Sequence, residues 1–295
     1  GILSGLDVFA NIADGFKAQM TELGYIEGMN IIYDFQKANV DVPAERVILK
    51  RFVDSKVDLI FAFPTEPALL AKEATKGTNI PVIFAQGGVE GSGLVQSIAY
   101  PGDNITGVRY PGPDVLVRRL EIMHELIPEA KRFYLTYQLD YPTVRLALIA
   151  IRPVASVLGV TLVEVPIKTV EDIEADLNAR DNLNDVGIDA ILIVPESLSQ
   201  SPRGFGAIIK FANKHKIPLA ASNIKSGAVF SYTSDNIETG RLAASLADKI
   251  FKGVPAGTIM VATPTSDLRL NYKLAQELGL NVSKRLMGLA KEVTR

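Results

Sequence analysis

The chain has 295 residues, of which 47% are hydrophobic and 22% charged, a composition typical of a folded globular protein with room for two domains. Its 31 basic and 33 acidic residues nearly cancel, which argues against nucleic acid as a partner. The absence of cysteine excludes disulfides, thiolate metal sites and cysteine nucleophiles. No apolar stretch reaches the roughly 18 residues of a membrane span. The chain opens on a strand-like segment, so we expect an N-terminal segment, such as an export signal, to precede it.

Strand-like apolar runs alternate with helical periods in the first half of the chain, which predicts an α/β fold with a parallel sheet between helices. A first strand at 1–4 is followed by an amphipathic helix that begins near Phe9 and ends before Gly24. The elements expected next are a strand at 29–36, a helix at 42–54, a strand at 57–63, a helix at 65–76 and a strand at 80–85.

A second series of the same kind follows residues 111–113. The elements expected there are a helix at 114–127, a strand at 131–137, a helix at 142–158, a strand at 160–165, a helix at 169–180, a strand at 188–194, a helix at 203–214 and a strand at 217–222. The tail adds a strand at 227–233, a helix from Asp235 to Gly253, strand-like segments at 258–263 and 268–272, and a helix to 278–279.

The two series are similar to each other. The segment Val57–Pro64 matches Ile188–Pro195, and Asn79–Phe84 matches Lys216–Ala221. This pattern favours the duplication of one Rossmann-like lobe over coincidence. We therefore expect two similar lobes joined by a hinge of several crossing segments, with a ligand cleft between them. The N-terminal lobe comprises 1–108 and about 233–260, and the C-terminal lobe about 109–232 and 261–295.

Ligands of open parallel sheets bind beyond the carboxyl ends of the strands. Six turns are expected there, at 4–9, 64–67, 86–93, 138–142, 196–202 and 222–227. Their hydroxyl, amide and carboxylate side chains suit a small polar ligand, although the same residue types also cap helices. Because six polar turns fall on the same sheet edges, we favour a ligand cleft.

Signatures of catalysis are mostly missing. There is no G-x-x-x-x-G-K-[ST] phosphate loop, and the glycine-rich segment 87–93 lacks dinucleotide-binding spacing. Neither His124 nor His215 belongs to a cluster with metal-ligand spacing. A carboxylate pair such as Glu66 and Glu196, one in each lobe, leaves acid–base catalysis open. We expect no enzyme, no cofactor and no metal site.

Several segments match a known family, and the most specific is Pro101-Gly102-x-Asn104-Ile105-Thr106-Gly107-Val108. The others are Leu23-Gly24-Tyr25-x-x-Gly28-x-Asn30, Val57–Ile60, Ile80–Phe84, Gly93-Leu94-Val95-x-Ser97, Ile188–Ile191, Lys216–Pro218, Gly240-Arg241 and Asn271–Gly279. In these segments, which extend over nearly the whole chain, the sequence resembles the substrate-binding components of ABC transporters. The group includes tryptophan- and tyrosine-binding proteins with a type I periplasmic-binding-protein fold.

The resemblance implies an exported protein, either periplasmic or an extracellular lipid-anchored one, that is monomeric. It would trap one small molecule by closure of two lobes and present it to a membrane permease. The implied ligand is an amino acid, in particular an aromatic one, or a related carboxylate. The implied ligand-binding residues are Ser4, Thr65, Glu66, Gln86, Tyr137, Gln138, Asp140, Glu196, Ser197, Ser222, Asn223 and Asp235. We add Phe9 and Tyr141 as aromatic candidates in or beside the same turns.

Roles follow from side-chain chemistry. Phe9, Tyr137 and Tyr141 are candidates to stack on a ring. Glu196, Asp140 and Asp235 are candidates to pair with a ligand ammonium group, and Arg109 with its carboxylate.

Three turns depart from the family pattern. Gln138-Leu139-Asp140-Tyr141 replaces Asn-Pro-x-x-x-Asn, Pro195-Glu196-Ser197 replaces Pro-Thr-Asp, and Ser222-Asn223 replaces Gly-Asp. The pocket is therefore expected to differ at several contact positions. A ligand-sensing module of a receptor or regulator would have the same cleft, and it stays open as an alternative, as does a two-lobed enzyme.

Overall fold

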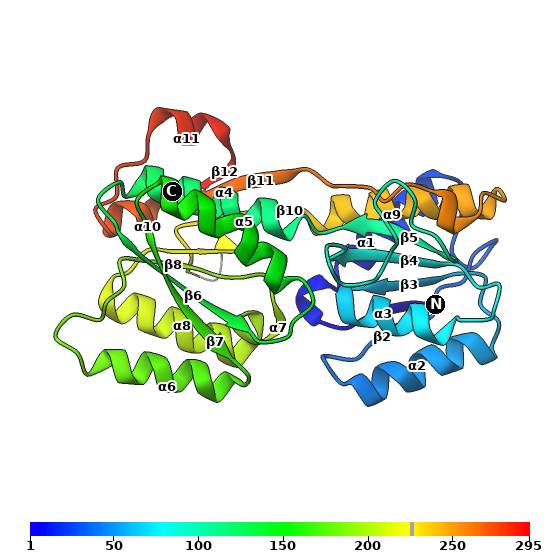
Figure 1. The fold of residues 1–295 in the computed structure, drawn as a ribbon. Coiled ribbons are helices and arrows are strands. Elements are labelled where there is room, and N and C mark those ends of the chain that lie inside the picture. The colour runs from blue at the N-terminus through cyan, green and yellow to red at the C-terminus, as the bar shows by residue number, and fades with distance from the viewer. Residues whose placement is uncertain (225–226) are drawn as a thin grey trace. The chain divides into compact units, whose positions relative to one another are not determined.

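The computed structural model describes residues 1–224 and 227–295, and the chain divides into two compact units. Unit 1 comprises Gly1–Pro111 and Ser234–Thr265, and unit 2 comprises Gly112–Thr233 and Ser266–Arg295. Each unit contains its own sheet with helices on both faces (Figure 1). Both units are therefore discontinuous in sequence.

Unit 1 is built on a five-stranded sheet in the order β2-β1-β3-β4-β5, with parallel pairing throughout. Its strands are β1 (Ile2–Ser4), β2 (Phe35–Lys37), β3 (Ile60–Phe63), β4 (Val82–Gly87) and β5 (Ile105–Arg109). Its helices are η1 (Asp7–Phe9), α1 (Ile12–Glu22), α2 (Val42–Asp54), α3 (Thr65–Ala74), α9 (Asn236–Phe251) and η3 (Ala256–Thr258).

Side chains of the central strands alternate between two cores. Phe61 of β3 and Ile83 of β4 pack with α1 and α9, whereas Ile60 and Phe84 pack with α2 and α3. A strand that is buried on both faces requires apolar residues at every position, which is why these segments read as continuous apolar runs.

Unit 2 contains a seven-stranded sheet in the order β12-β11-β10-β9-β8-β6-β7. Its strands are β6 (Arg132–Gln138), β7 (Thr161–Ile167), β8 (Ala190–Leu192), β9 (Leu219–Ala221), β10 (Phe230–Ser234), β11 (Ser266–Asn271) and β12 (Ala290–Thr294). One core contains residues of α4 (Gly112–Leu126), α5 (Val144–Val157), α10 (Tyr272–Glu277) and α11 (Lys284–Leu289). The other contains residues of α6 (Val170–Asp181) and α8 (Pro202–His215), and the short helix α7 (Ser197–Gln200) precedes α8.

The strand order β7-β6-β8-β9-β10 in unit 2 repeats the order β2-β1-β3-β4-β5 in unit 1. The predicted α/β architecture of two similar lobes with mostly parallel sheets is thus confirmed. Among the described residues, no helix is both long and apolar enough to cross a membrane.

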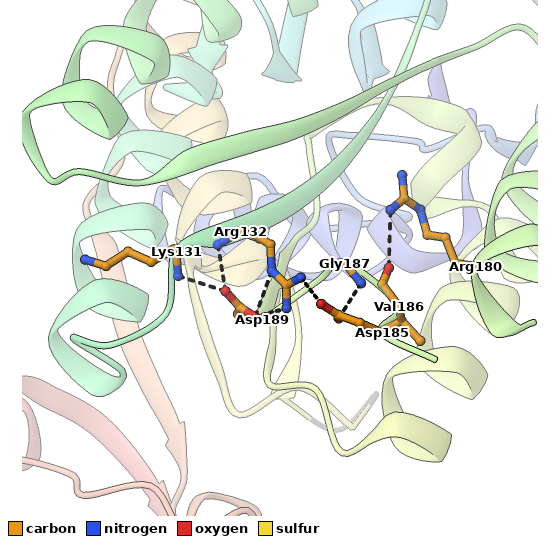
Figure 2. Close-up of polar contacts among 7 residues, drawn as sticks. All are labelled: Lys131, Arg132, Arg180, Asp185, Val186, Gly187 and Asp189. Atoms are coloured by element: carbon orange, nitrogen blue, oxygen red, sulfur yellow. Dashed lines mark hydrogen bonds and ion pairs between the residues drawn. The ribbon is translucent and has the colours of Figure 1, made fainter. Parts of the chain in front are cut away.

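A polar cluster joins the amino ends of β6 and β8, at the opposite end of the strands from the expected ligand turns (Figure 2). Asp189 Oδ2 accepts hydrogen bonds from the backbone N–H groups of Lys131 (2.9 Å) and Arg132 (2.8 Å). The Arg132 guanidinium spans Asp189 Oδ1 (2.7 Å) and Asp185 Oδ2 (2.5 Å). Burial alone would raise the pKa of Asp189, but these donors outweigh it and hold the pKa below its ordinary value.

The strand expected at 29–36 is confirmed only at residues 35 and 36, because only Phe35–Lys37 pairs as β2. The side chain of Asn30 accepts a hydrogen bond from Ile26 N (2.6 Å) and donates one to Gly24 O (2.9 Å), which closes a loop instead. Met29 and Ile32, two apolar residues of this run, are 84% and 88% exposed.

The strand expected at 258–263 is wrong. The segment begins in the 3₁₀ turn η3, and Ala262 makes an isolated bridge to Val108 of β5. The first helix starts at Ile12 rather than near Phe9, which ends η1. Short elements that carry little periodicity were not predicted, namely β5, α7, α11 and β12.

Candidate ligand-binding site

Three predicted residues of unit 1 lie at the carboxyl edge of its sheet. Ser4 ends β1, Thr65 begins α3 directly after β3, and Gln86 lies near the end of β4. All three are buried. Thr65 Oγ1 accepts a hydrogen bond from Gly88 N (3.0 Å), and Ser4 Oγ donates one to Leu6 O (2.9 Å). The two hydroxyls thus hold the loops that follow β4 and β1.

Gln86 is the centre of a polar network at this edge. Its Nε2 donates to Ser234 Oγ (3.1 Å) and Asn236 Oδ1 (3.2 Å). Asn236 Nδ2 in turn donates to Asn11 Oδ1 (2.9 Å) and Val8 O (3.1 Å). Gln86 has a φ of +50°, a backbone conformation that is uncommon for a residue with a side chain. Such strain is frequent at binding sites, where the surrounding contacts enforce it.

The other predicted residues of unit 1 lie in or beside its helices. Asp235 is the N-cap of α9, and its side chain accepts hydrogen bonds from Ile237 N (2.9 Å) and Glu238 N (3.1 Å). Phe9 packs against the core that α1 and α9 share, and Glu66 lies in the first turn of α3.

Glu45 is a charged residue of this region that sequence reasoning missed. It lies in the first turn of α2 and is only 2% exposed. Its Oε2 makes no hydrogen bond to the residues that the structure describes. Burial, together with the neighbouring carboxylates Glu66 and Asp41, raises the pKa of Glu45 to about 7. Its spacing in the sequence could have indicated that it is buried, because Glu45, Leu49 and Phe52 lie on the same face of α2.

In unit 2, the predicted residues Glu196 and Ser222 are joined through Gln200. The Glu196 carboxylate caps α7 by accepting hydrogen bonds from Leu198 N (2.6 Å) and Ser199 N (2.8 Å). Ser222 Oγ donates to Gln200 Oε1 (2.9 Å), and Gln200 Nε2 donates to the Glu196 carbonyl (3.4 Å). This chain of contacts connects the turns that follow β8 and β9.

Arg119 supports these turns from α4 and was also missed by sequence reasoning. It is fully buried, and its guanidinium donates to Ile193 O (2.9 Å), Tyr232 O (3.1 Å) and Ser222 Oγ (3.4 Å). It thereby links β10 to the segments that follow β8 and β9. Like Glu45, Arg119 occupies the buried stripe of an amphipathic helix, between Leu116 and Met123.

The remaining predicted residues of unit 2 lie in or beside the same turns. Tyr137 and Tyr141 are partly buried against the core of α4 and α5. Gln138 ends β6 with its Oε1 buried and without a hydrogen bond to the described residues. Asp140 is exposed with a φ of +61°. Ser197 begins α7, and Asn223 is exposed. The turn expected at 222–227 includes residues 225 and 226, which lie outside the described residues.

The remaining charged candidates are engaged elsewhere. Arg109 forms an ion pair with Glu90 and donates to Thr263 Oγ1 (2.9 Å). His215 ends α8 and lies 2.6 Å from Asp181 Oδ1, and His124 lies within α4. Glu66 and Glu196 belong to different units. In the described part of the chain, no group of three or more histidine, aspartate or glutamate residues could hold a metal ion.

Each unit thus presents a polar carboxyl edge built from hydroxyl, amide and carboxylate groups, an arrangement suited to hydrogen bonding a small polar molecule. Two α/β units with one strand order, each interrupted in sequence, have the type I periplasmic-binding-protein fold. Residues 3–294 match the family model described as ABC transporter substrate binding protein, and the chain belongs to this family.

Comparison with individual proteins agrees with this assignment. The chain is 31% identical over 254 residues to a protein named tyrosine-binding protein from Clostridioides difficile (strain R20291), covering 84% of this chain and 70% of the relative. Its fold is similar to that of an ABC domain from Streptococcus pneumoniae in complex with L-Trp, with a TM-score of 0.86, 22% identity and coverage of 99% and 98% of the two chains. A ligand-free, open structure of a substrate binding protein with adhesive properties from Clostridium difficile is similar with a TM-score of 0.75, 25% identity and coverage of 100% and 98%.

Proposed function

We propose that this protein binds an aromatic amino acid through the polar carboxyl edges of its units and presents it to an ABC permease outside the cytoplasm. The observation that carries the proposal is the pair of polar carboxyl edges, one per unit, in a chain whose relative is named a tyrosine-binding protein. Such proteins close two lobes around a ligand. We further propose that the protein acts as a monomer, without catalysis, as a periplasmic protein or a lipid-anchored one.

In the proposed complex, the predicted turn residues of both units contact the ligand. Gln86 and Thr65 contribute polar groups from unit 1, and Gln138 and Ser222 contribute them from unit 2. Tyr137 and Tyr141 offer the exposed parts of their rings to an aromatic side chain. The preorganisation that Gln86 and Ser222 receive from their networks supports this assignment, because rigid polar groups lose little entropy on binding.

The test is a thermal-shift screen of protein that has been unfolded and refolded to remove any bound ligand. The panel contains L-tyrosine, L-tryptophan, L-phenylalanine, aliphatic amino acids, sugars and purines. Because the chain has no tryptophan, an extrinsic dye reports unfolding. A ligand at one hundred times its Kd stabilises the folded state by about 2.7 kcal/mol. We expect the clearest shift with an aromatic amino acid.

A matched pair of variants connects the shift to the site. Gln86→Ala removes the centre of the unit 1 network and should reduce the ligand-induced shift. Gln276→Ala, which changes an exposed glutamine of α10, should leave the shift unchanged. A shift produced by sugars or purines and not by amino acids would replace the proposed ligand class.

A further inference from the structure

The position of Glu45 in the fold is unusual for a carboxylate. Glu45, Leu49 and Phe52 form the buried face of helix α2. A glutamate therefore lies at a position where an amphipathic helix normally has an apolar residue. Transfer of an ionised carboxylate into such surroundings is costly unless a partner offsets it. Oε2 makes no hydrogen bond to the described residues, so the described part of the chain does not supply this partner to that oxygen.

Glu45 lies beneath two of the predicted ligand turns. A Cβ atom placed on Gly5 would lie 2.9 Å from Glu45 Oε1 and 2.4 Å from Pro67 Cγ, so Glu45 is next to the turns that follow β1 and β3. Gly5 leaves space for the carboxyl group where any side chain would collide with it.

The charges around Glu45 favour a cation. Glu66, in the first turn of α3, and Asp41, the N-cap of α2, are the charged groups that act most strongly on Glu45, and both are acidic. Lys37, at the end of β2, pairs with Asp7 of η1 at 3.3 Å. The region therefore combines several carboxylates with one deeply buried, unsatisfied carboxyl oxygen.

We propose that Glu45 and Glu66 form the ammonium-recognition pair of the ligand site, and that Glu45 exchanges a bound proton for the ammonium group of the ligand. This inference rests on the proposed amino-acid-binding function and names the group of unit 1 that selects the ligand. In the ligand-free protein the Glu45 carboxyl holds its proton below about pH 7. When the ligand ammonium arrives, the O–H bond of Glu45 breaks, the proton passes to solvent, and the carboxylate accepts an N–H hydrogen bond from the ammonium group.

The exchange makes affinity dependent on pH. Because the proton competes with the ammonium group, affinity should rise by up to tenfold per pH unit below the pKa of Glu45 and should level off above it. A ligand without an ammonium group should show no such dependence from this residue.

Titration calorimetry with L-tyrosine, tyramine and desaminotyrosine between pH 6 and 8.5 tests the proposal. Repeating each titration in buffers of different ionisation enthalpy counts the protons released. Tyramine keeps the ammonium group and desaminotyrosine lacks it. We expect the two amines to release close to one proton at pH 6 and almost none at pH 8.5, and desaminotyrosine to release none.

Variants separate this role from a structural one. Glu45→Gln should abolish proton release and weaken binding of both amines by roughly 10- to 100-fold, the range expected for a hydrogen bond to a charged group. It should leave desaminotyrosine binding unchanged. Glu66→Gln should shift proton release to lower pH, because a neighbouring negative charge is removed. Glu73→Gln, at an exposed carboxylate paired with Arg46, is the matched control. Proton release that persists in Glu45→Gln, or an equal loss of affinity for desaminotyrosine, would overturn the inference.

A second measurement separates failure of this inference from failure of the proposed function. If no aromatic amino acid binds the wild-type protein, the proposed function fails on its own. Carbon NMR of glutamate-labelled protein, with the Glu45 signal assigned by its absence in Glu45→Gln, then reports the titration of Glu45 with and without methylammonium. A lower midpoint in methylammonium supports the ammonium site, and an unchanged midpoint excludes it.

Discussion

Gly15 and Gly240 meet where α1 packs against α9. A Cβ atom on Gly240 would lie 2.1 Å from the carbonyl oxygen of Ile12 and 3.1 Å from the carbonyl carbon of Gly15. A Cβ atom on Gly15 would lie 2.1 Å from the carbonyl oxygen of Ile237. The backbones of the two helices are therefore in direct contact, and this contact closes the core on one face of unit 1.

Substitution of Gly240 by alanine should separate α1 from α9. We expect Gly240→Ala to lower the free energy of unfolding by about 2–3 kcal/mol, because the added methyl group meets backbone atoms that have no side-chain freedom to move away. Urea denaturation measures the change. Gly206→Ala in α8 is the control, since a Cβ atom there meets open space and should stabilise the helix by about 0.5–1 kcal/mol. Equal effects of the two substitutions would contradict the proposed contact.

The buried carboxyl of Glu45 should make stability depend on pH. Its pKa is raised from 4.5 to about 7 on folding, so between these values the folded chain holds a proton that the unfolded chain has lost. The free energy of unfolding should therefore fall as pH rises from about 4.5 to 7, by up to about 3 kcal/mol in total, and should be constant above. The comparison is made with ligand-free Glu45→Gln protein, which lacks this component. Parallel stability curves for the two proteins would show that folding does not raise the pKa of Glu45.

The cluster around Asp189 should contribute to the stability of unit 2. Asp189→Asn replaces a carboxylate that accepts hydrogen bonds from two backbone amides and from Arg132, and we expect a loss of about 2–3 kcal/mol at pH 7. Because folding lowers the pKa of Asp189, its contribution is present above the unfolded value near 4 and disappears as pH falls through the folded value. The difference between wild type and variant should thus shrink in acid.

Asp54→Asn is the matched control for that experiment. Asp54 pairs with Lys50 on the exposed face of α2, and such pairs contribute less than about 1 kcal/mol. A loss of stability in Asp54→Asn as large as that in Asp189→Asn would argue against a special role for the β6–β8 cluster.

Two neighbouring arginines of α4 offer a direct comparison. Arg119→Lys replaces a planar group that bonds three acceptors with a single ammonium group, which cannot reach all of them. We expect a loss of about 2–3 kcal/mol in the free energy of unfolding, measured by denaturation, and weaker ligand binding through the displaced Ser222. Arg118→Lys, at a partly exposed ion pair with Glu121, should change stability by less than about 0.5 kcal/mol.

Local signals were sufficient to predict much of the fold. Helix α2 was predicted over its exact range, and in the structure the Asp41 side chain caps it and Pro43 lies in its first turn. The strands with uninterrupted apolar residues were likewise recognised. The loop at 29–34 was not, since the Asn30 side chain competes for backbone groups in a way that hydrophobic periodicity does not register.

The candidate site shows the same limit. The positions of turn residues such as Gln86 and Ser222 can be predicted because they come directly after strands. The residues that they hydrogen bond cannot be predicted in this way. Asn236 reaches Gln86 across 150 residues of sequence. Glu45 and Arg119 lie on the buried faces of their helices. From helical periodicity alone, such positions are expected to be apolar, and a charged side chain is expected to extend into solvent. Their roles depend on tertiary contacts, which no local pattern contains.

The interleaving of the two units has a consequence for the order in which the protein is made. Tyr25 Oη donates to Asp248 Oδ1 at 3.1 Å, a contact between residues separated by 223 positions. A nascent chain that has emerged as far as β5 still lacks α9, so the apolar face of α1, including Phe16 and Met20, has no covering helix. Unit 1, although it starts first, cannot complete this core until α9 (Asn236–Phe251) has left the ribosome, after most of unit 2 has been synthesised.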